Sequence, residues 1–358
     1  MISYRVQHFG APLQRHDEPT PTPQGREVLL RVLAAGVCHT DLHTWQGWYD
    51  LGGGKRLTMG DRGIGLPLTL GHEIAAEVVA GGPQAEGVRI GQRVLAYPWL
   101  GCGACKVCRR GDEQLCPTPR FLGIFRAGGY ASHVLVPDAH GLVDIGDLAP
   151  ERAAPLACSG LTTYSAIHRI RPQVLREEPV VVIGAGGLGL MALSLLRALG
   201  SPGVVLVEPN PVRRQAALDG GALAAVDPAA PDAAAQVRAA LGGAAWAVID
   251  CVGATSTVQL GLDLLVKGGQ LVLVGLFGGE LALPLPLVPI RAISIEGSYV
   301  GTLAELQDLV ALVRRHGIAP IPTTCCTLQR APWALGEIEA GRVVGRLVLQ
   351  PDLEETPT

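Results

Sequence analysis

The alternation of apolar and polar positions divides the chain into two parts that meet near residue 150. In the first part, residues 26–36 (REVLLRVLAAG) and 73–80 (EIAAEVVA) are rich in β-forming residues and partly alternate in polarity. Short apolar runs recur around 88–97 and 133–136, with Gly and Pro turns between them. This pattern predicts an irregular, mostly β domain.

The second part alternates short, wholly apolar strands with helical stretches rich in Ala and Leu. Its predicted strands lie at 180–183 (VVVI) and within the segments GVVLVEP, AWAVIDCVG and GGQLVLVG. Strands that are apolar on both faces and alternate with helices are typical of a parallel sheet covered by helices on both sides. Right-handed crossovers then give a doubly wound Rossmann domain, so the predicted fold class is α/β.

The tail after residue 300 contains a helical stretch (LAELQDLVALVRRHG) and a short strand (GRLVLQ). We expect this tail to return to the first domain. A chain of 358 residues has the length of about two ordinary domains. The predicted division places residues 1–158 and 300–358 in one domain and residues 159–299 in the other.

The composition limits which cellular compartment and which binding partners are expected. With 48% hydrophobic residues, 17% charged residues and a net charge of -3, the chain has material for a core and no expected basic patch for nucleic acid or an anionic membrane. No apolar run reaches the ~18 residues of a membrane span and the N-terminal segment lacks a secretory apolar region, so a cytoplasmic protein is expected. In that compartment the nine cysteines favour metal binding or free thiols over disulfides. Ordinary thiols are expected at Cys251, Cys325 and Cys326.

A glycine-rich turn follows the strand that ends at Ile183. It spells G-x-G-x-x-G, and a helix is predicted directly after it at 188–199. The first glycine permits the tight turn, the second lets a pyrophosphate approach the backbone, and the third lets helix and strand pack closely. The free N–H groups and partial positive charge of the helix N-terminus suit phosphate groups. The residues expected to bind the cofactor at this turn are Gly184, Gly186, Gly187, Leu188 and Gly189.

An acidic residue, Glu208, follows Gly189 by nineteen residues and lies at the end of the next strand. A carboxylate in that position accepts hydrogen bonds from the adenosine ribose hydroxyls and repels a 2′-phosphate, which favours NAD over NADP. Arg213 is a further candidate for cofactor binding. Arg213 and Arg214 together leave NADP open as an alternative.

Four cysteines with the spacing C-x2-C-x2-C-x7-C lie in a turn-rich segment (GCGACKVC and the residues after it). Four thiolates this close suit a tetrahedral zinc site, and four protein sulfurs leave no open position for chemistry, so a structural role is expected. An iron–sulfur cluster is the alternative, disfavoured because the fourth cysteine lacks the usual cluster spacing. The expected ligands are Cys102, Cys105, Cys108 and Cys116.

Three scattered residues, Cys38, His72 and Cys158, form a candidate catalytic metal site. A catalytic zinc takes three protein ligands and keeps one exchangeable position. Simpler interpretations exist for single residues, since Cys158 could be a small buried hydrophobe and His72 a satisfied core histidine. Because the three residues lie far apart in the sequence, spacing alone does not establish that they converge.

The order of five motifs resembles that of the zinc-containing alcohol dehydrogenases of the medium-chain dehydrogenase/reductase family. The motifs cover nearly the whole chain and are GVCHTDLH, GHE, the four-cysteine segment, ACSGLTTY and GAGGLG. The CHTDLH string is most similar to the tetrameric, yeast-type branch. The resemblance implies that residues 1–158 and 300–358 form a GroES-like catalytic domain and that residues 159–299 bind NAD. It also implies a homo-oligomer, with a tetramer favoured over a dimer.

The resemblance further implies two zinc ions per chain, one catalytic and one structural. Cys38, His72 and Cys158 match the ligands of the catalytic zinc, and the four-cysteine segment matches the structural site. Glu73 matches the acid beside the catalytic zinc. Asp41 matches the carboxylate that orients the zinc-bound histidine.

Around the substrate and the cofactor, the resemblance assigns further roles. Thr40 matches the hydroxyl that contacts the substrate oxygen, and His43 matches the outer end of a proton relay. His39 and Arg346 match contacts to the cofactor pyrophosphate, and Thr162 matches a residue near the nicotinamide.

The reaction implied by the resemblance is the reversible oxidation of a primary or secondary alcohol to an aldehyde or ketone. Zinc, as a Lewis acid, lowers the pKa of the substrate hydroxyl, and hydride passes to NAD. One alternative is a polyol or sugar dehydrogenase of the same superfamily. Another is a non-catalytic NAD-binding regulatory protein.

The stretch between His43 and His72 is longer than its equivalent in the yeast-type enzymes and carries Trp45, Trp48 and Tyr49. Two interpretations stay open. These aromatic side chains line the substrate cleft and favour an apolar alcohol larger than ethanol, or they pack locally in a surface loop.

Overall fold

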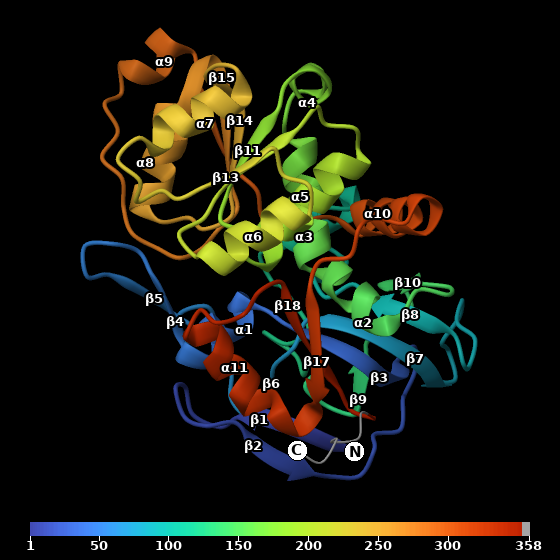
Figure 1. Cartoon of the computed structure of the whole chain (residues 1–358). Coiled ribbons are helices and arrows are strands. Elements are labelled where there is room, and N and C mark those ends of the chain that lie inside the picture. Colours follow the sequence, from blue (N-terminus) through green and yellow to red (C-terminus); the bar gives the residue numbers. More distant parts are fainter. Residues whose placement is uncertain (353–358) are drawn as a thin grey trace.

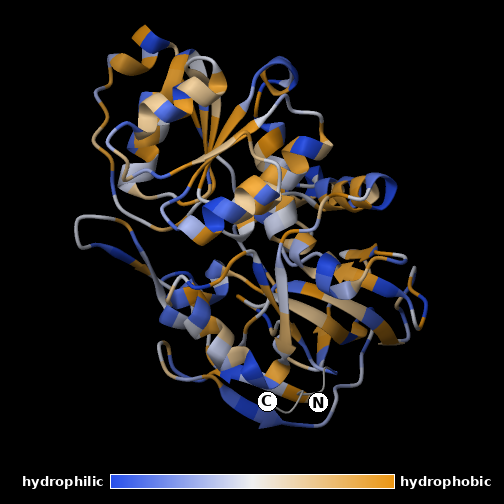
Figure 2. Ribbon diagram, viewed as in Figure 1, coloured by the Kyte–Doolittle hydropathy of each residue, from blue (hydrophilic) through white to orange (hydrophobic). Residues whose placement is uncertain are grey.

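The computed structural model, which describes residues 1–352, has two lobes (Figure 1). One lobe is built on a six-stranded parallel sheet and the other on largely antiparallel sheets. Apolar residues dominate the strands of the parallel sheet, as the sequence pattern predicts (Figure 2). Within residues 1–352, no helix is both long and apolar enough to cross a bilayer.

The parallel sheet has the connectivity of a Rossmann domain. Its strands are β11 (Val180–Ile183), β12 (Val204–Val207), β13 (Ala224–Val226), β14 (Ala245–Asp250), β15 (Leu265–Leu273) and β16 (Ser294–Gly297). They lie in the order β13-β12-β11-β14-β15-β16, and all neighbours pair in parallel. This is the doubly wound order, in which ligands bind where the strand order reverses, at the carboxyl ends of β11 and β14.

Helices cover both faces of this sheet because its strands are apolar on both faces. The helices between residues 159 and 300 are α3 (Ser159–His168), α4 (Pro172–Glu177), α5 (Gly187–Ala198), α6 (Pro211–Asp219), α7 (Ala233–Leu241), α8 (Thr255–Leu264) and α9 (Leu287–Arg291). Val180 and Val182 of β11 pack in one core cluster with α5, whereas Val181 and Ile183 pack in a second cluster with α7 and α8. Alternate side chains of this one buried strand thus pack against the helices on opposite faces of the sheet.

The other lobe combines the chain before α3 with the chain after residue 300. Its strands are β1 (Ile2–Val6), β2 (Gln14–Asp17), β3 (Val28–Val37), β4 (Trp48–Asp50), β5 (Arg56–Thr58), β6 (Leu68–Thr69), β7 (Glu73–Gly81), β8 (Arg93–Ala96), β9 (His133–Val136), β10 (Leu142–Asp144), β17 (Thr323–Thr327) and β18 (Arg346–Gln350). The main sheet has the order β10-β8-β7-β3-β18-β17, with β9 also paired to β3. A second sheet has the order β2-β1-β6, and β4 and β5 form a hairpin.

Strand β3 is the centre of this lobe and leads directly to the candidate site. It pairs with β7 and, through Leu347 opposite Val37, with β18 from the C-terminal segment. The helices of the lobe are α1 (His39–Gln46), α2 (Pro150–Ala153), α10 (Leu303–His316) and α11 (Ala331–Glu339). Helix α1 begins where β3 ends, which places the segment 38–43 at the boundary between the two lobes (Figure 1).

Candidate functional site

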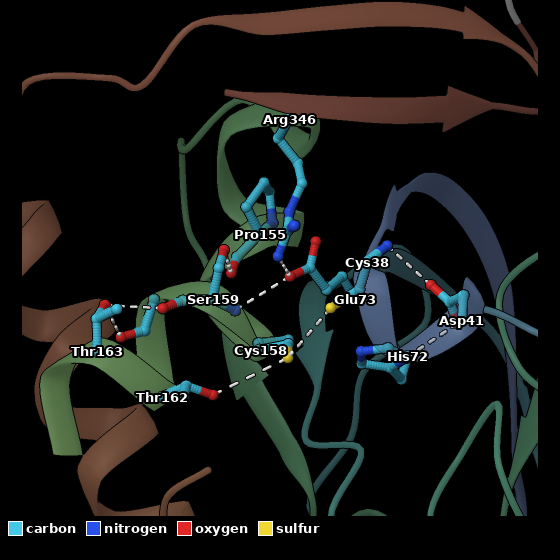
Figure 3. A network of polar contacts seen from close by, with 12 residues as sticks. Cys38, Asp41, His72, Glu73, Pro155, Cys158, Ser159, Thr162, Thr163 and Arg346 are labelled. Atoms are coloured by element: carbon cyan, nitrogen blue, oxygen red, sulfur yellow. Dashed lines mark hydrogen bonds and ion pairs between the residues drawn. The ribbon is translucent and has the colours of Figure 1, made fainter. Parts of the chain in front are cut away.

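Elements from distant parts of the chain bring Cys38, His72 and Cys158 together (Figure 3). Cys38 joins β3 to α1, His72 precedes β7, and Cys158 precedes α3. Because β3 and β7 pair with Gly36 opposite Glu73, the first two residues lie side by side. The Sγ atoms of Cys38 and Cys158 are 4.0 Å apart. All three residues are buried, and their ligand atoms lie within 4.8 Å of one another.

The two ring nitrogens of His72 have different surroundings. Nδ1 is 3.1 Å from Oδ1 of Asp41, whereas Nε2 is buried and has no hydrogen-bond partner within residues 1–352. A bond from Nδ1–H to the carboxylate leaves the Nε2 lone pair free, which is the form of histidine that binds a metal. A buried polar atom without a partner is costly. The arrangement therefore fits a metal ligand better than a satisfied core histidine.

Asp41 is held in place from several directions. Its Oδ1 accepts hydrogen bonds from His72 and from the backbone N–H of Gly71, at 3.1 and 3.0 Å. Its Oδ2 accepts from the backbone N–H of Cys38 at 2.9 Å and from the hydroxyl of Tyr130 at 3.1 Å. The carboxylate is fully buried, so these donors replace the water that it has lost and fix the orientation of the imidazole.

The donor set and spacing of this site fit zinc. Sulfur atoms bound to one zinc at ~2.3 Å in tetrahedral geometry lie ~3.8 Å apart. The 4.0 Å between the Cys38 and Cys158 sulfurs is close to that value. Two thiolates and one imidazole leave a fourth position free, and both cysteines border a cavity. A site of this kind has room for a reacting molecule.

Glu73 lies beside these ligands, and its carboxylate points toward Arg346 (Figure 3). Its Oε1 accepts hydrogen bonds from Nη2 of Arg346 at 2.5 Å and from the backbone N–H of Ser159 at 3.0 Å. Burial raises the pKa of Glu73 to about 7, against the opposing effect of the Arg346 charge. Arg346 also approaches the glycine-rich turn, because a Cβ placed on Gly187 would lie 3.0 Å from its Nη1. Arg346 thus connects the metal site with the nucleotide turn.

The four-cysteine cluster is formed within a single loop of the β lobe. The sulfur–sulfur distances are 3.4 Å for Cys105–Cys108 and 3.9 Å for both Cys102–Cys108 and Cys105–Cys116. Backbone N–H groups of Ala104 and Cys105 point at the Cys102 sulfur and lower the pKa of that thiol to about 6. These distances match the spacing of sulfurs around one tetrahedral zinc, and four thiolates complete its shell.

One cavity of about 720 Å³ extends from Cys38 and Cys158 to the glycine-rich turn. Asp41 and Glu73 lie behind its wall, where both are fully buried. The other predicted site residues that line it are His39, Thr40, His43, Thr162, Gly184, Gly186, Gly187, Leu188, Gly189, Glu208, Arg213 and Arg346.

The three aromatic residues after His43 have different positions. Tyr49 lines the cavity, with its ring 4.8 Å from the His43 ring. Trp45 lies outside the lining, because its indole N–H donates to the backbone carbonyl of Ala11 at 2.6 Å. Trp48 also lies outside and stacks on Arg56, at 3.7 Å from the guanidinium carbon to the ring. The two tryptophans thus pack locally and do not line the cavity, whereas Tyr49 does line it.

The glycine-rich turn has the geometry that a dinucleotide requires. Gly184 directly follows β11 and has a φ of +91°, a conformation that residues with a side chain rarely adopt. A Cβ on Gly189 would lie 1.7 Å from the Gly184 carbonyl oxygen, so helix and strand approach closely only with glycine there. A Cβ on Gly186 would meet no atom within 4 Å, which leaves that part of the backbone open to a ligand. Helix α5 begins at Gly187, one residue earlier than predicted.

Glu208 follows β12 and is buried at the edge of the cavity. Its carboxylate accepts backbone N–H groups at 2.8 and 2.9 Å, one of them from the glycine-rich turn. The two arginines nearby are already engaged. Arg213 donates to two backbone carbonyls at 3.0 and 2.7 Å, and Arg214 pairs with Asp227 at 3.0 Å.

His39 and His43 lie one turn apart on α1, with ring centroids separated by 5.0 Å. Burial lowers the pKa of His43 to about 4, and the neighbouring His39 lowers it further in the same direction. Burial also lowers the pKa of His39. Both imidazoles are therefore neutral at pH 7, so each can accept one proton and pass one on.

Several residues of the site have no motif that marks them in the sequence. Trp99 packs on His72 with ring centroids 5.4 Å apart, and the hydroxyl of Tyr130 donates to the buried carboxylate of Asp41. Arg62 and Tyr299 line the cavity. The sequence offers one indication for the aromatic residues among them. Only 4% of the chain is aromatic, so each aromatic position is a candidate for a specific role.

Comparison with known proteins identifies the family. Residues 24–147 match the model of the alcohol dehydrogenase GroES-like domain, and residues 187–315 match the model named zinc-binding dehydrogenase. An NAD-dependent alcohol dehydrogenase from Sulfurisphaera tokodaii is 36% identical over 98% of this chain and 100% of its own length. A protein with the same description from Saccharolobus solfataricus is 35% identical over 98% of this chain and 100% of its own length. The crystal structure of the alcohol dehydrogenase from Aeropyrum pernix is 31% identical, with a TM-score of 0.87 over 98% of this chain and 100% of that chain.

The chain therefore belongs to the zinc-containing alcohol dehydrogenases of the medium-chain dehydrogenase family. The predicted α/β class, with a GroES-like and a Rossmann domain, is confirmed. The similarity of the CHTDLH string to the yeast-type branch stays a prediction.

Proposed function

We propose that this protein oxidises a primary or secondary alcohol reversibly to an aldehyde or ketone, with NAD as the hydride acceptor. The observation that carries the proposal is one cavity bordered at one end by Cys38 and Cys158, which cluster with His72, and at the other end by the glycine-rich turn. A reacting carbon held at the metal can thus meet a nicotinamide ring held by the Rossmann domain. When bound, zinc supplies a Lewis acid that lowers the pKa of the substrate hydroxyl, and NAD takes up the hydride.

We assign two zinc sites to each chain. Cys38, His72 and Cys158 would hold the catalytic ion, because the unpaired Nε2 of His72 and the two thiol groups share one small volume. Asp41 keeps the imidazole in the tautomer that binds metal. The four-cysteine loop would hold the second ion, and its closed shell gives it a structural role.

The proton of the alcohol would leave along helix α1. The hydroxyl of Thr40 and the ring of His43 both line the cavity, one turn or less apart along the helix. We assign to Thr40 the contact with the substrate oxygen and to His43 the outer end of the relay. A neutral imidazole can accept a proton on one nitrogen while it releases another to solvent, which suits His43 for this position.

The nucleotide would extend from the metal site across the glycine-rich turn. His39 and Arg346 are assigned to the pyrophosphate, together with the backbone N–H groups at the start of α5, and Thr162 to the nicotinamide. Glu208 is assigned to the adenosine ribose hydroxyls, where its charge disfavours the 2′-phosphate of NADP. Arg214 is engaged by Asp227, whereas Nη1 of Arg213 lies 3.9 Å from the Glu208 carboxylate and offsets part of its charge. NADP therefore stays the alternative that the comparison of the two cofactors tests.

The same proposal includes the domain division and the assembly. Residues 1–158 and 300–358 would form the catalytic domain and residues 159–299 the NAD-binding domain, which is supported by the pairing of β18 with β3. A homo-oligomer, either tetramer or dimer, is supported by β16 at the sheet edge and by exposed apolar side chains in it and shortly before it in the chain, Ile295 at 39% and Ile290 at 63% exposure. Reduced cysteines at metal spacing suit the cytoplasm.

A panel of primary, secondary and aromatic alcohols with NAD and NADP, combined with a zinc assay, tests the proposal. We expect turnover with NAD, two zinc ions per chain and loss of turnover after chelation. Turnover that survives complete removal of zinc would contradict the catalytic assignment.

A sugar or polyol substrate is the second candidate. The D-arabinose 1-dehydrogenase (NADP(+)) of Saccharolobus solfataricus is 32% identical over 97% of this chain and 96% of its own length. Cys158 argues against the polyol branch, which often has glutamate as the equivalent ligand. The same panel with pentoses and polyols added distinguishes the two candidates.

A further inference from the structure

The segment between α1 and β6 places one cationic side chain, Arg62, in the wall of the cavity. The turn that carries it is anchored at both ends by buried side chains, Met59 and Ile64. The backbone N–H of Met59 donates to the carbonyl of Gly47 at the end of α1, at 2.8 Å. The hairpin β4–β5 before this turn also touches the nucleotide-binding lobe, because a Cβ on Gly52 would lie 2.8 Å from the backbone nitrogen of Glu280. The position of Arg62 over the cavity is thus set by the fold on both sides.

The guanidinium of Arg62 lies among aromatic rings and a thioether. Its carbon is 5.4 Å from the ring centre of Tyr49 and 5.9 Å from that of Phe125, and Nη1 is 3.8 Å from the sulfur of Met59. Within residues 1–352, no carboxylate oxygen lies within 4.0 Å of the Arg62 guanidinium; all Arg–carboxylate pairs at that distance involve other arginines. Arg62 is partly buried, and a cation in such a position without an anionic partner is costly.

The phenol groups next to Arg62 do not supply the missing negative charge. Burial raises the pKa of Tyr49 to about 12, and it also raises the pKa of Tyr299. The Arg62 charge opposes both shifts but is the smaller effect. Both phenols therefore stay protonated at neutral pH. Both phenol oxygens accept a hydrogen bond from Arg62, so their own O–H groups can donate to a further acceptor.

This cation borders the substrate end of the cavity. Tyr299 packs on Trp99 with ring centroids 6.3 Å apart, and Trp99 packs on the metal-site residue His72. On the other side, Tyr49 packs on the relay residue His43. The acidic residues that line the cavity, Glu208 and Glu339, are not paired with Arg62. A molecule bound at the metal would extend along this aromatic wall toward Arg62.

We propose that Arg62 makes the enzyme selective for alcohols and carbonyl compounds that carry a carboxylate on an apolar chain. This inference rests on the proposed function and names the substrate class of the same site. The aromatic rings contact the carbon chain, and the carboxylate receives two parallel hydrogen bonds from the guanidinium. The hydroxyls of Tyr49 and Tyr299 are available as further donors. A single guanidinium matches the single charge of a carboxylate better than the double charge of a phosphate ester.

The test uses the zinc-loaded enzyme with NAD and four alcohols of equal chain length. They are ω-hydroxyhexanoate, its methyl ester, ω-hydroxyhexyl phosphate and hexanol. We expect Arg62→Gln to lower the ratio of kcat/KM for the carboxylate over its ester by ~10–100-fold, the usual range for a charge-assisted bond. Arg62→Lys, which keeps the charge but loses the bidentate geometry, should retain part of that ratio. The KM for NAD should change little, because the side chains that Arg62 contacts are Tyr49, Phe125 and Met59, none of which belongs to the glycine-rich turn.

Arg56→Gln is the matched control. Arg56 belongs to the same inserted segment and also stacks on an aromatic ring, but it is exposed and does not line the cavity. Its substitution should leave the carboxylate-to-ester ratio as it is in the unsubstituted enzyme.

A binding measurement makes the inference independent of turnover. Titration of the NADH-loaded enzyme with hexanoate and with hexanamide should give a Kd for hexanoate that rises ~10–100-fold in Arg62→Gln, with a much smaller change for hexanamide. An unchanged ratio in the kinetic and the binding experiment would show that Arg62 serves only the packing of its loop. A preference for the phosphate ester over the carboxylate would overturn the substrate class. If no alcohol is oxidised while hexanoate binding still depends on Arg62, the proposed function fails and the anion site stands.

Discussion

The two thiol-rich sites of this protein use the same donor atom in opposite constructions. The four-cysteine cluster is formed within one loop, from Cys102 to Cys116; three of its members are half-buried and only Cys116 is buried. The Cys-His-Cys cluster joins Cys38 to Cys158 across 120 positions of the chain, and all of its members are buried. One site needs only a loop, whereas the other needs the whole fold.

Because of this difference, we expect the four-cysteine cluster to contribute to stability and the Cys-His-Cys cluster to contribute to the reaction. Four thiolates fill a tetrahedral shell, so a metal there can only hold its loop together. Three ligands beside a cavity leave room for a reacting molecule, and their placement depends on β3, β7 and α3 being correctly packed. We therefore expect substitutions in the loop cluster to affect mainly unfolding, and substitutions in the distributed cluster to affect mainly turnover.

The largest expected effect comes from Cys38→Ser. Loss of the Lewis acid should lower kcat/KM by on the order of 10³-fold or more. The zinc content should fall from two ions per chain to one, and Tm should fall only by the stability that binding of this one ion adds to the folded chain, so the loss of turnover is the main effect. Kinetics and metal analysis on the same preparation provide the measurement. Substantial turnover with one zinc retained would place the reaction elsewhere.

Cys105→Ser should have the opposite effect to Cys38→Ser: a loss of stability with little loss of turnover. The loop cluster loses a ligand, and the free energy of metal binding that stabilises the folded chain is lost with it. We expect Tm to fall by at least ~5 °C, which corresponds to a few kcal/mol for a domain of this size. Turnover per folded molecule, measured well below Tm, should stay within a few-fold of the unsubstituted enzyme. Cys325→Ser removes an exposed thiol outside both clusters and serves as the control.

The same contrast explains what could be predicted from the sequence. The loop cluster, the glycine-rich turn and the buried strands of the Rossmann sheet follow from local spacing and apolarity, and the structure has β11 at the predicted residues 180–183. The Cys-His-Cys cluster could be proposed only with the help of family resemblance, because no spacing links its members. The short hairpin β4–β5 and the N-terminal strands β1 and β2 carry little apolar pattern, and the sequence does not predict them.

The positions of the Arg62, Trp45 and Trp48 side chains could not be predicted from the sequence, because tertiary packing sets them. An arginine in a loop is exposed in most proteins, and only the anchoring of Met59 and Ile64 turns this one toward the cavity. Trp45 and Trp48 found partners close in space outside the cleft, one on a backbone carbonyl and one on Arg56. Side-chain direction in a loop is set by such contacts, which sequence pattern does not encode.

A smaller effect is expected from Asp41→Asn, which leaves all three metal ligands in place. The amide supplies a donor where the carboxylate accepts from four groups, so at least one hydrogen bond is lost and His72 is no longer held in one tautomer. Substitution of such a supporting residue costs ~10–100-fold in metal affinity or activity. Competition with a chelator measures the affinity. Tyr130→Phe removes one contact to the same carboxylate and should cost less than Asp41→Asn; an equal cost would assign the effect to packing instead.

The smallest effect is expected from His43→Ala, since this residue is assigned to the outer end of the proposed relay and is not one of the proposed metal ligands. Turnover should fall by roughly tenfold or less, below the ~10²-fold typical of a direct acid–base group. Imidazole buffer should restore part of the rate, because a small base can occupy the space left by the ring. A large loss without rescue would mean that His43 acts on the reacting atoms themselves.

His43 also links pH to stability in a direction that the same variant can test. Burial lowers its pKa from 6.5 to about 4, so the unfolded chain binds this proton more readily than the folded protein does. The stabilising contribution is therefore complete above pH 6.5 and is lost as the pH falls toward 4, by up to about 3 kcal/mol. We expect the free energy of unfolding of the unsubstituted protein to decline more steeply than that of His43→Ala in this window. Parallel pH profiles from denaturant titrations would show that the ring takes up its proton without cost, and that the relay histidine is more open to water than its position in the cavity wall indicates.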